Sequence, residues 1–249
     1  NKIINCNLFK NLTLGVDPKL FTSNQLKKFF LNNNKIKFIK KNLIKKLQKK
    51  KITIKKPFFS LKTNVVGESH VKKINRVVRI LKKNKCDFTF ITAPENIAWL
   101  LNIRGYDNPN SPMPNCHLIV NKKKRFFLIV KKEKVKNLLK EKKINIRQII
   151  DPKNFEVFIN KLNKGKILID NKTCSIFYEK ILKSKFQILK KTDPIYYLKS
   201  IKNKTEIKNM IRSHISDGVA LTKFLYWIKY KNKKKITEYD AQVKLEKFR

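Results

Sequence analysis

Hydrophobic and polar positions follow two periods through the central part of the chain. Short apolar or alternating runs predict strands at residues 86–91, 117–120, 126–130, 144–150, 166–170 and 186–189. Apolar residues three and four apart predict helices between these strands, at residues 71–81, 97–101, 135–139, 155–162 and 173–182. Because strands that alternate with helices are typical of an α/β domain, we expect this fold class for residues 67–193.

Residues with capping chemistry precede several of these helices. Ser69 and Thr173 are predicted N-caps of the helices that follow them. Thr92 and Glu95 have the spacing of a capping box, and Pro94 suits the first turn, where a missing N–H costs little. The helix at the centre of the chain should therefore begin near residue 94.

The same helix has a predicted end and a predicted turn after it. We expect it to end near Asn102, and Gly105 should let the backbone turn sharply after Arg104. Residues 107–115 contain three prolines, which excludes regular structure there. Trp99 lies on the apolar side of the helix and is expected in the core.

The residues before this domain resemble the end of another α/β domain, at residues 1–55. Strands are predicted at 12–16 and 35–39, and helices are predicted after Ser23 and at 43–47. Residues 52–66 follow no period, and we assign 56–66 as a linker.

The pattern changes again after Asp193 and Pro194. Residues 195–202 are expected to form a short helix or a linker, and apolar spacing predicts one long helix at 205–230. Gly218 within the long helix costs about 1 kcal/mol relative to alanine, so we expect close packing there. Thr237 and Asp240 form a second predicted capping box, before a helix that continues to the last residue.

Net charge is the most unusual feature of the composition. The 249 residues include 61 lysines and arginines and 17 acidic residues, which gives a formal charge of +44. Such a charge favours a nucleic-acid binder, but nearly all of it is lysine, whereas arginine is the usual fork for phosphates and bases. The lysines are spread along the chain together with many Asn and Ile residues, a bias that an AT-rich genome produces. We therefore expect no specific nucleic-acid partner.

The sequence contains no apolar run near the roughly 18 residues of a membrane helix, and no signal peptide is visible at its start. This predicts a cytoplasmic protein without a membrane partner. The chain opens with Asn1 and stops at Arg249 within a helical pattern, which predicts a fragment.

Cysteine and histidine spacing argues against a metal site. The four cysteines are far apart, without a C-x-x-C pair, and are expected to be reduced and mostly buried. His214 and Asp217 are three apart on one predicted helix, but no third ligand stands a turn away. Asp17, Asp151 and Asp193 lie at turns, where their side chains suit backbone contacts rather than catalysis.

The stretch 91–107, ITAPENIAWLLNIRGYD, resembles a motif of the aminopeptidase P (Xaa-Pro aminopeptidase) family. The family pattern is T-A-x-x-E-I-A-W-L-x-N-x-R-G-x-D. The matching residues are Thr92, Ala93, Ile97, Ala98, Trp99, Leu100, Asn102, Arg104, Gly105 and Asp107. The sequence departs from the pattern at Pro94, Glu95 and Asn96, where a Leu-Asp-Glu-like triplet is usual.

A second resemblance lies near the end of the chain and points to the entry of the family's catalytic "pita-bread" domain. The matching residues are Lys199, Ser200, Ile201, Lys202, Asn203, Glu206, Ile207, His214, Asp217, Gly218, Val219, Ala220, Leu221, Thr237, Glu238, Ala241, Leu245, Glu246, Phe248 and Arg249. The turn at Gly15–Pro18 and the segment from Gly67 also fit the family, so the resemblance covers essentially the whole chain.

The resemblance implies a fold, an activity and a division of the chain. The fold would be a creatinase/prolidase-type N-terminal domain with a mixed sheet flanked by helices, followed by the first helices of a truncated α+β pita-bread domain. The divisions would be 1–55, the linker 56–66, 67–193 and 194–249. The activity would be a metalloaminopeptidase that removes an N-terminal residue preceding proline.

The family uses two divalent ions, usually manganese, held by two Asp, one His and two Glu in the body of the pita-bread domain. No residue of this sequence matches them, so the resemblance implies no catalytic or metal-binding residue here and an inactive fragment. The implied partners are peptides with proline at the second position and a second subunit in a homodimer.

Arg104 is the one residue that we assign to substrate binding. It could contact substrate or a neighbouring subunit near the mouth of the active site, or it could pair with Asp107 and fix the loop at Gly105; the pair with Asp107 is the favoured interpretation. Two other functions stay open: a non-catalytic binding protein of the same architecture, as in some histone chaperone subunits, and a creatinase or prolidase.

Overall fold

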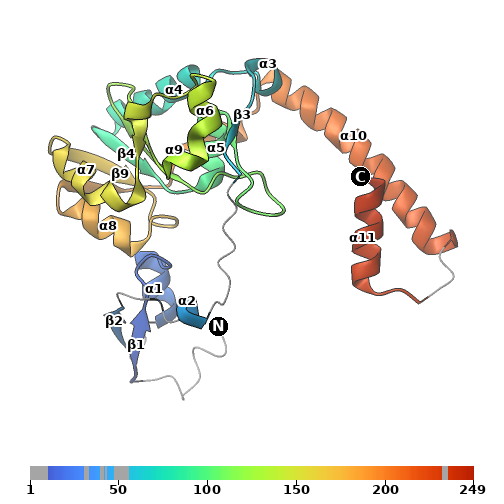
Figure 1. The fold of residues 1–249 in the computed structure, drawn as a ribbon, viewed down its shortest axis with the longest axis horizontal. Coiled ribbons are helices and arrows are strands. Elements are labelled where there is room, and N and C mark those ends of the chain that lie inside the picture. Colours follow the sequence, from blue (N-terminus) through green and yellow to red (C-terminus); the bar gives the residue numbers. More distant parts are fainter. Residues whose placement is uncertain (1–10, 31–33, 40–41, 43, 48–55, 232–234) are drawn as a thin grey trace. The chain divides into compact units, whose positions relative to one another are not determined.

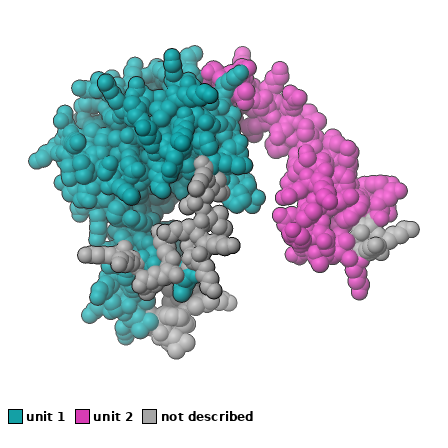
Figure 2. All heavy atoms as spheres, in the orientation of Figure 1, with its two compact units in different colours: residues 1–62, 69–201 teal, residues 63–68, 202–249 magenta. Residues whose placement is uncertain are grey.

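The computed structural model describes residues 11–30, 34–39, 42, 44–47, 56–231 and 235–249. The chain divides into two compact units, shown in different colours in Figure 2. Unit 1 consists of residues 1–62 and 69–201, and unit 2 of residues 63–68 and 202–249. The boundaries inferred from sequence at residues 55, 66 and 193 stay a prediction.

A six-stranded mixed sheet forms the centre of unit 1, with the strand order β10-β9-β4-β6-β7-β8 (Figure 1). Its strands are β4 (Phe88–Ile91), β6 (His117–Asn121), β7 (Phe126–Ile129), β8 (Ile149–Ile150), β9 (Gly165–Ile169) and β10 (Phe186–Lys190). β4, β9 and β10 are parallel, β6 is antiparallel to both β4 and β7, and β8 is parallel to β7. The predicted mixed sheet is confirmed.

Helices cover both faces of this sheet, because its strands carry apolar side chains on both faces. The helices are α4 (His70–Lys83), α5 (Pro94–Leu101), α6 (Lys136–Lys140), α7 (Phe155–Lys161), α8 (Ile176–Lys183) and α9 (Pro194–Ser200). Side chains of α4, α5, α6 and α9 join one core cluster, and those of α7 and α8 join the other. In β4, Phe90 belongs to the second cluster and Ile91 to the first. Thr89 is also buried and donates to the carbonyl of Leu168, so β4 has no polar face.

In the described part of the chain, three 3₁₀ segments complete the domain: Lys132–Val135, Ile146–Gln148 and Pro152–Asn154. The strand predicted at 144–150 is therefore wrong over most of its length. Asn145 and Gln148 form a capping box that turns the chain into a 3₁₀ helix, and only Ile149–Ile150 pairs with β7.

Two predicted helix caps are displaced from their expected positions. Ser69 caps α4 as predicted, accepting from the backbone of Lys72. The cap of α8 is Ser175 rather than Thr173. At the start of α1, Thr22 and Gln25 exchange side-chain-to-backbone hydrogen bonds, whereas the hydroxyl of Ser23 donates to Glu179 at 2.6 Å.

The described residues before β3 add four small elements to unit 1: β1 (Thr13–Val16), α1 (Ser23–Phe30), β2 (Lys35–Phe38) and α2 (Ile44–Leu47). β1 and β2 are parallel, and Val16 and Leu26 pack with Ile176 of α8. Leu43, predicted in the helix at 43–47, lies outside the described residues.

The predicted linker contains regular structure. β3 (Phe59–Ser60) pairs with β5 (Ile103–Arg104), and α3 (Thr63–Val66) follows. Phe58 beside β3 is fully buried. No hydrophobic period marked this segment because each element is only two to four residues long.

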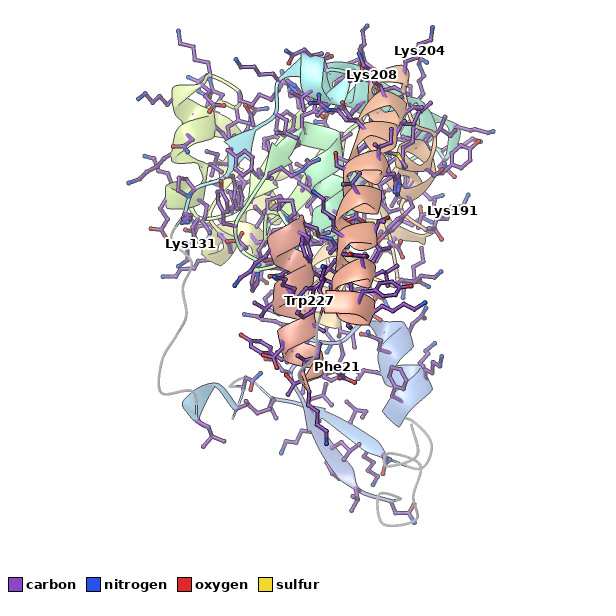
Figure 3. All side chains as sticks on the ribbon, turned by 90° about the vertical axis from the view of Figure 1, so that its right-hand side faces the viewer. Phe21, Lys131, Lys191, Lys204, Lys208 and Trp227 are labelled. Carbon is purple, nitrogen blue, oxygen red and sulfur yellow. The ribbon has the colours of Figure 1, made fainter. Side chains whose placement is uncertain are left out.

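Unit 2 consists of α3, α10 (Lys204–Tyr226), a π-helical turn at Trp227–Lys231 and α11 (Glu238–Phe248). Asn203 and Glu206 form a capping box at the start of α10, and Asn203 also donates to the carbonyl of Val66. The predicted box of Thr237 and Asp240 is confirmed. In Figure 3, Lys204 and Trp227 mark the two ends of α10.

Close packing at Gly218 is not found. A methyl group built there would meet no described atom within 4 Å. Most large apolar residues of α10 are exposed in this structure, including Ile207, Ile211 and Ile215. No helix among the described residues is long and apolar enough to cross a membrane.

Candidate functional site

The residues that carry the central motif lie on α5 and on the turns at its two ends. β4 ends at Ile91, and α5 begins at Pro94, which occupies the first turn as predicted. The expected capping box is wrong, because the N-cap is Ala93 and no side chain caps the helix. The hydroxyl of Thr92 donates to that of Thr173 at 2.7 Å, and Glu95 accepts from the hydroxyl of Tyr196 at 2.8 Å.

A buried acidic pair lies next to the start of α5. Asp170 follows β9 and Asp193 precedes α9, and they are 3% and 4% exposed. The backbone N–H of Asp193 donates to Asp170 at 2.9 Å, and the amide of Asn96 donates to Asp193 at 2.7 Å. Asp193 also caps α9 by accepting from the backbone of Ile195.

Burial raises the pKa of Asp193 to about 6, and nearby Asp170 acts in the same direction. The hydrogen bonds from Ile195 and Asn96 oppose this shift. The turn chemistry expected of Asp193 is confirmed by its cap, and that of Asp17 and Asp151 by their backbone contacts. The burial of Asp193 could not be read from the sequence.

Two cationic side chains bind the C-terminal carbonyl groups of α5. Lys73 is 1% exposed, and its ammonium group donates to the carbonyl of Trp99 at 2.9 Å and to the side chain of Asn102 at 2.7 Å. The same ammonium lies 4.2 Å from the centre of the Trp99 ring. Arg104 supplies the second cation, to the carbonyl of Ala98 at 3.0 Å. Cations are favourable at this end of a helix because its last carbonyl groups have no intrahelical donor and form the negative end of the helix dipole.

Asn102 and Gly105 shape the turn after α5. Asn102 adopts the left-handed conformation with φ 55°, at the position where helices often end. Gly105 has no positive φ; a methyl group there would lie 2.9 Å from the Cα of Pro114 and 3.0 Å from the ring of Phe58. Glycine is therefore required at residue 105 for close approach. The proline-containing stretch 107–115 has no helix or strand, as predicted.

The favoured interpretation of Arg104, a pair with Asp107, is wrong. Asp107 forms an ion pair with Lys134 and accepts from the backbone of Asn115 at 2.7 Å. Arg104 instead donates from Nη1 to the carbonyl of Ala98 at 3.0 Å and to the carbonyl of Ile103 at 2.9 Å. Burial lowers the pKa of Arg104. Its contact with substrate or subunit stays a prediction.

Sequence reasoning missed Lys73 as part of this site. Lys73 lies beside Ile74 and one turn before Val77 on α4, and its direction toward the core distinguishes it from its neighbour Lys72. An isolated lysine on an apolar helix face is a usable signal in most proteins. In a chain with 61 basic residues that signal is lost.

The described residues contain no group of three His, Cys, Asp or Glu side chains that could hold a metal ion. Asp217 forms an ion pair with Arg249 at 2.7 Å rather than a site with His214. His117 is partly buried between Phe90 and Tyr178, and burial lowers its pKa to about 4. Cys86, Cys116 and Cys174 are buried free thiols. A two-metal centre therefore does not fit the side chains described here.

Positively charged side chains are spread widely over unit 1 and are not confined to this site. Lys131 and Lys191, for example, lie on opposite sides of unit 1 in Figure 3. The cations at α5 are set apart from the other lysines by their burial and their bonds to carbonyl groups.

Comparison with known proteins identifies relatives for nearly the whole chain. The family model of the creatinase/prolidase N-terminal domain matches residues 49–206. The chain is 31% identical to Xaa-Pro aminopeptidase 1 of Dictyostelium discoideum over 78% of its length. It is 29% identical to a probable Xaa-Pro aminopeptidase P of Sordaria macrospora over 95% of its length. It spans 32% and 42% of the lengths of these two relatives.

The fold is similar to that of an X-prolyl aminopeptidase from Caenorhabditis elegans, described as a cytosolic enzyme with a di-nuclear active site. The TM-score is 0.81 at 23% identity, and the match covers 96% of this chain and 41% of that one. An Xaa-Pro dipeptidase from Bacillus anthracis matches with a TM-score of 0.54 at 16% identity, over 72% of this chain and 48% of the other. The family model covers more than half of the chain, and the chain therefore belongs to the creatinase/prolidase N-terminal domain family.

Proposed function

We propose that this chain is a fragment of a metal-dependent Xaa-Pro aminopeptidase, an enzyme that removes an N-terminal residue preceding proline. The observation that carries the proposal is its similarity over 95% of its length to a probable Xaa-Pro aminopeptidase P, together with the C. elegans fold match. The substrates would be peptides with proline at the second position. A bond before proline lacks an N–H and has a restricted geometry, so it needs a dedicated site.

Residues outside this chain would hold two divalent metal ions, which we propose are manganese. When bound, such ions activate a water molecule and polarise the scissile carbonyl. The residues described here would bind the substrate peptide and position it. α5 and the turn at Gly105 would present Arg104 to the substrate, and unit 2 would lead into the catalytic domain. We further propose a cytoplasmic homodimer that binds polyanions only nonspecifically, with an affinity that falls as salt rises.

The test compares two proteins made from the same gene. The first is the complete open reading frame and the second is residues 1–249, each assayed with manganese on Ala-Pro-Phe and on Ala-Ala-Phe as the matched peptide without proline. The complete protein should release alanine only from Ala-Pro-Phe, lose this activity in a chelator and regain it with manganese. The 1–249 chain should release none.

Two results would contradict the proposal. One is a complete protein that folds and binds manganese but leaves Ala-Pro-Phe intact. The other is metal-dependent turnover by residues 1–249, which would place the reaction on side chains of this chain. Light scattering of the complete protein tests the dimer separately.

A further inference from the structure

Arg104 has one edge of its guanidinium group fixed and another without a partner. Its Nη1 donates to the carbonyl groups of Ala98 and Ile103 at 3.0 and 2.9 Å. Its Nε and Nη2 donate to no described residue, and no described carboxylate lies within ion-pair distance. Arginine binds a carboxylate best through two parallel N–H groups, and the Nε–Nη2 edge offers such a pair.

The surroundings of Arg104 do not neutralise its charge. The side chain is half-buried, and burial lowers its pKa without a compensating carboxylate. Asp107, the nearest acidic residue in sequence, is occupied by Lys134 and by the backbone of Asn115. A partly buried cation without an anion is costly to a folded protein, so a ligand that supplies the anion would be favoured.

The backbone on both sides of Arg104 is held in place. Asn102 accepts from the backbone of Leu61 at 2.8 Å, and its side chain accepts from Lys73. Arg104 pairs with Phe59 across the β3–β5 ladder, and Gly105 is pressed against Pro114. A cation held in this way loses little freedom when a ligand binds, which favours affinity.

We propose that Arg104 binds the free C-terminal carboxylate of a short peptide, and that Lys73 is a positioning residue for it. Lys73 acts through Asn102 and the carbonyl of Trp99, which set the turn that carries Arg104. The inference rests on the proposed function, because that function makes a peptide the ligand. It adds a chemical requirement to it: a carboxylate at the end of the peptide.

The experiment measures binding of Ala-Pro-Phe with a free C-terminal acid and of the same peptide with a C-terminal amide. The complete protein is used without manganese for binding, and with manganese for KM and kcat. The wild type should bind the acid about tenfold more tightly than the amide, the usual effect of a charge-assisted pair. In Arg104→Gln this preference should vanish, and Arg104→Lys should keep only part of it because lysine lacks the fork.

Lys73→Met should reduce the acid preference, measured as the ratio of the dissociation constants for the amide and the acid, toward the value found in Arg104→Gln. Arg125→Gln is the matched control, because Arg125 is exposed beside the β6–β7 turn and its substitution removes the same charge. It should leave the preference as in the wild type. A purely structural role for Arg104 would weaken both peptides equally, and circular dichroism verifies that each variant is folded.

The outcomes separate the two proposals. If the protein does not hydrolyse Ala-Pro-Phe but the acid preference exists and depends on Arg104, the proposed function fails and the carboxylate site stands. Equal binding of acid and amide to the wild type, or a preference that survives in Arg104→Gln, would overturn the site. A dimer that dissociates in Arg104→Gln, with equal binding of both peptides, would place the carboxylate on a second subunit and would also overturn the peptide assignment.

Discussion

Replacing Asp193 by asparagine should remove a pH-dependent loss of stability. Asp193 is 4% exposed, and burial raises its pKa from an ordinary value of 3.8 to about 6. The folded protein therefore holds this proton more tightly than the unfolded chain does. The stabilisation is complete below the unfolded pKa and is lost as the pH rises through about 6.

The size of the effect follows from this gap. A difference between 3.8 and about 6 corresponds to roughly 3 kcal/mol of unfolding free energy. Asparagine carries no charge at either pH. Its oxygen can still accept from the backbone of Ile195. Its NH₂ group can donate to the side-chain oxygen of Asn96 once the Asn96 amide turns over, since that oxygen has no partner among the described residues. We expect Asp193→Asn to be more stable than the wild type by about 1–3 kcal/mol at pH 8, and within about 1 kcal/mol at pH 4.5.

Urea unfolding followed by circular dichroism between pH 4.5 and pH 8 measures this difference. Subtracting the unfolding free energy of the wild type from that of the variant cancels the contributions of titrating groups common to both, such as His117. Asp151→Asn is the matched control, because exposed Asp151 makes the same kind of bond, to the backbone of Lys153. A difference between variant and wild type that does not change with pH would refute the reasoning.

Three further substitutions test the packing around α5 and α10. Lys73→Met should cost about 2–4 kcal/mol in urea unfolding, because it removes the ammonium group that donates to the Trp99 carbonyl and the Asn102 side chain, whereas exposed Lys72→Met should be near neutral. Equal losses of stability in the two variants would contradict a stabilising role for the hydrogen bonds of buried Lys73. Gly105→Ala should lower the melting temperature by about 2–8 °C, from a loss of roughly 1–2 kcal/mol, because the methyl group meets the backbone of Pro114 at 2.9 Å. Gly218→Ala has open space and should raise helix stability by up to about 1 kcal/mol; a loss would show unseen packing there.

Periodicity and local chemistry were sufficient for the elements of unit 1. Apolar alternation located β4, β6, β7, β9 and β10, because a side chain on a strand has only two directions and both faces of this sheet are buried. Pro94 at the start of α5 and the box of Thr237 and Asp240 depend on neighbours within one turn, so the sequence contained the information. The order of the motif residues was also enough to identify the family.

Only the tertiary structure decided which partners the polar side chains take. Thr92 and Glu95 have the spacing of a capping box, yet they bind Thr173 and Tyr196, which lie 81 and 101 residues away. Arg104 does not pair with Asp107. That carboxylate forms an ion pair with Lys134, which lies 27 residues after Asp107. A hydrogen bond gains little net free energy in water, so a partner brought close by packing of the core outcompetes a local one. The sequence determines which groups can bond, and the packed core determines which of them meet.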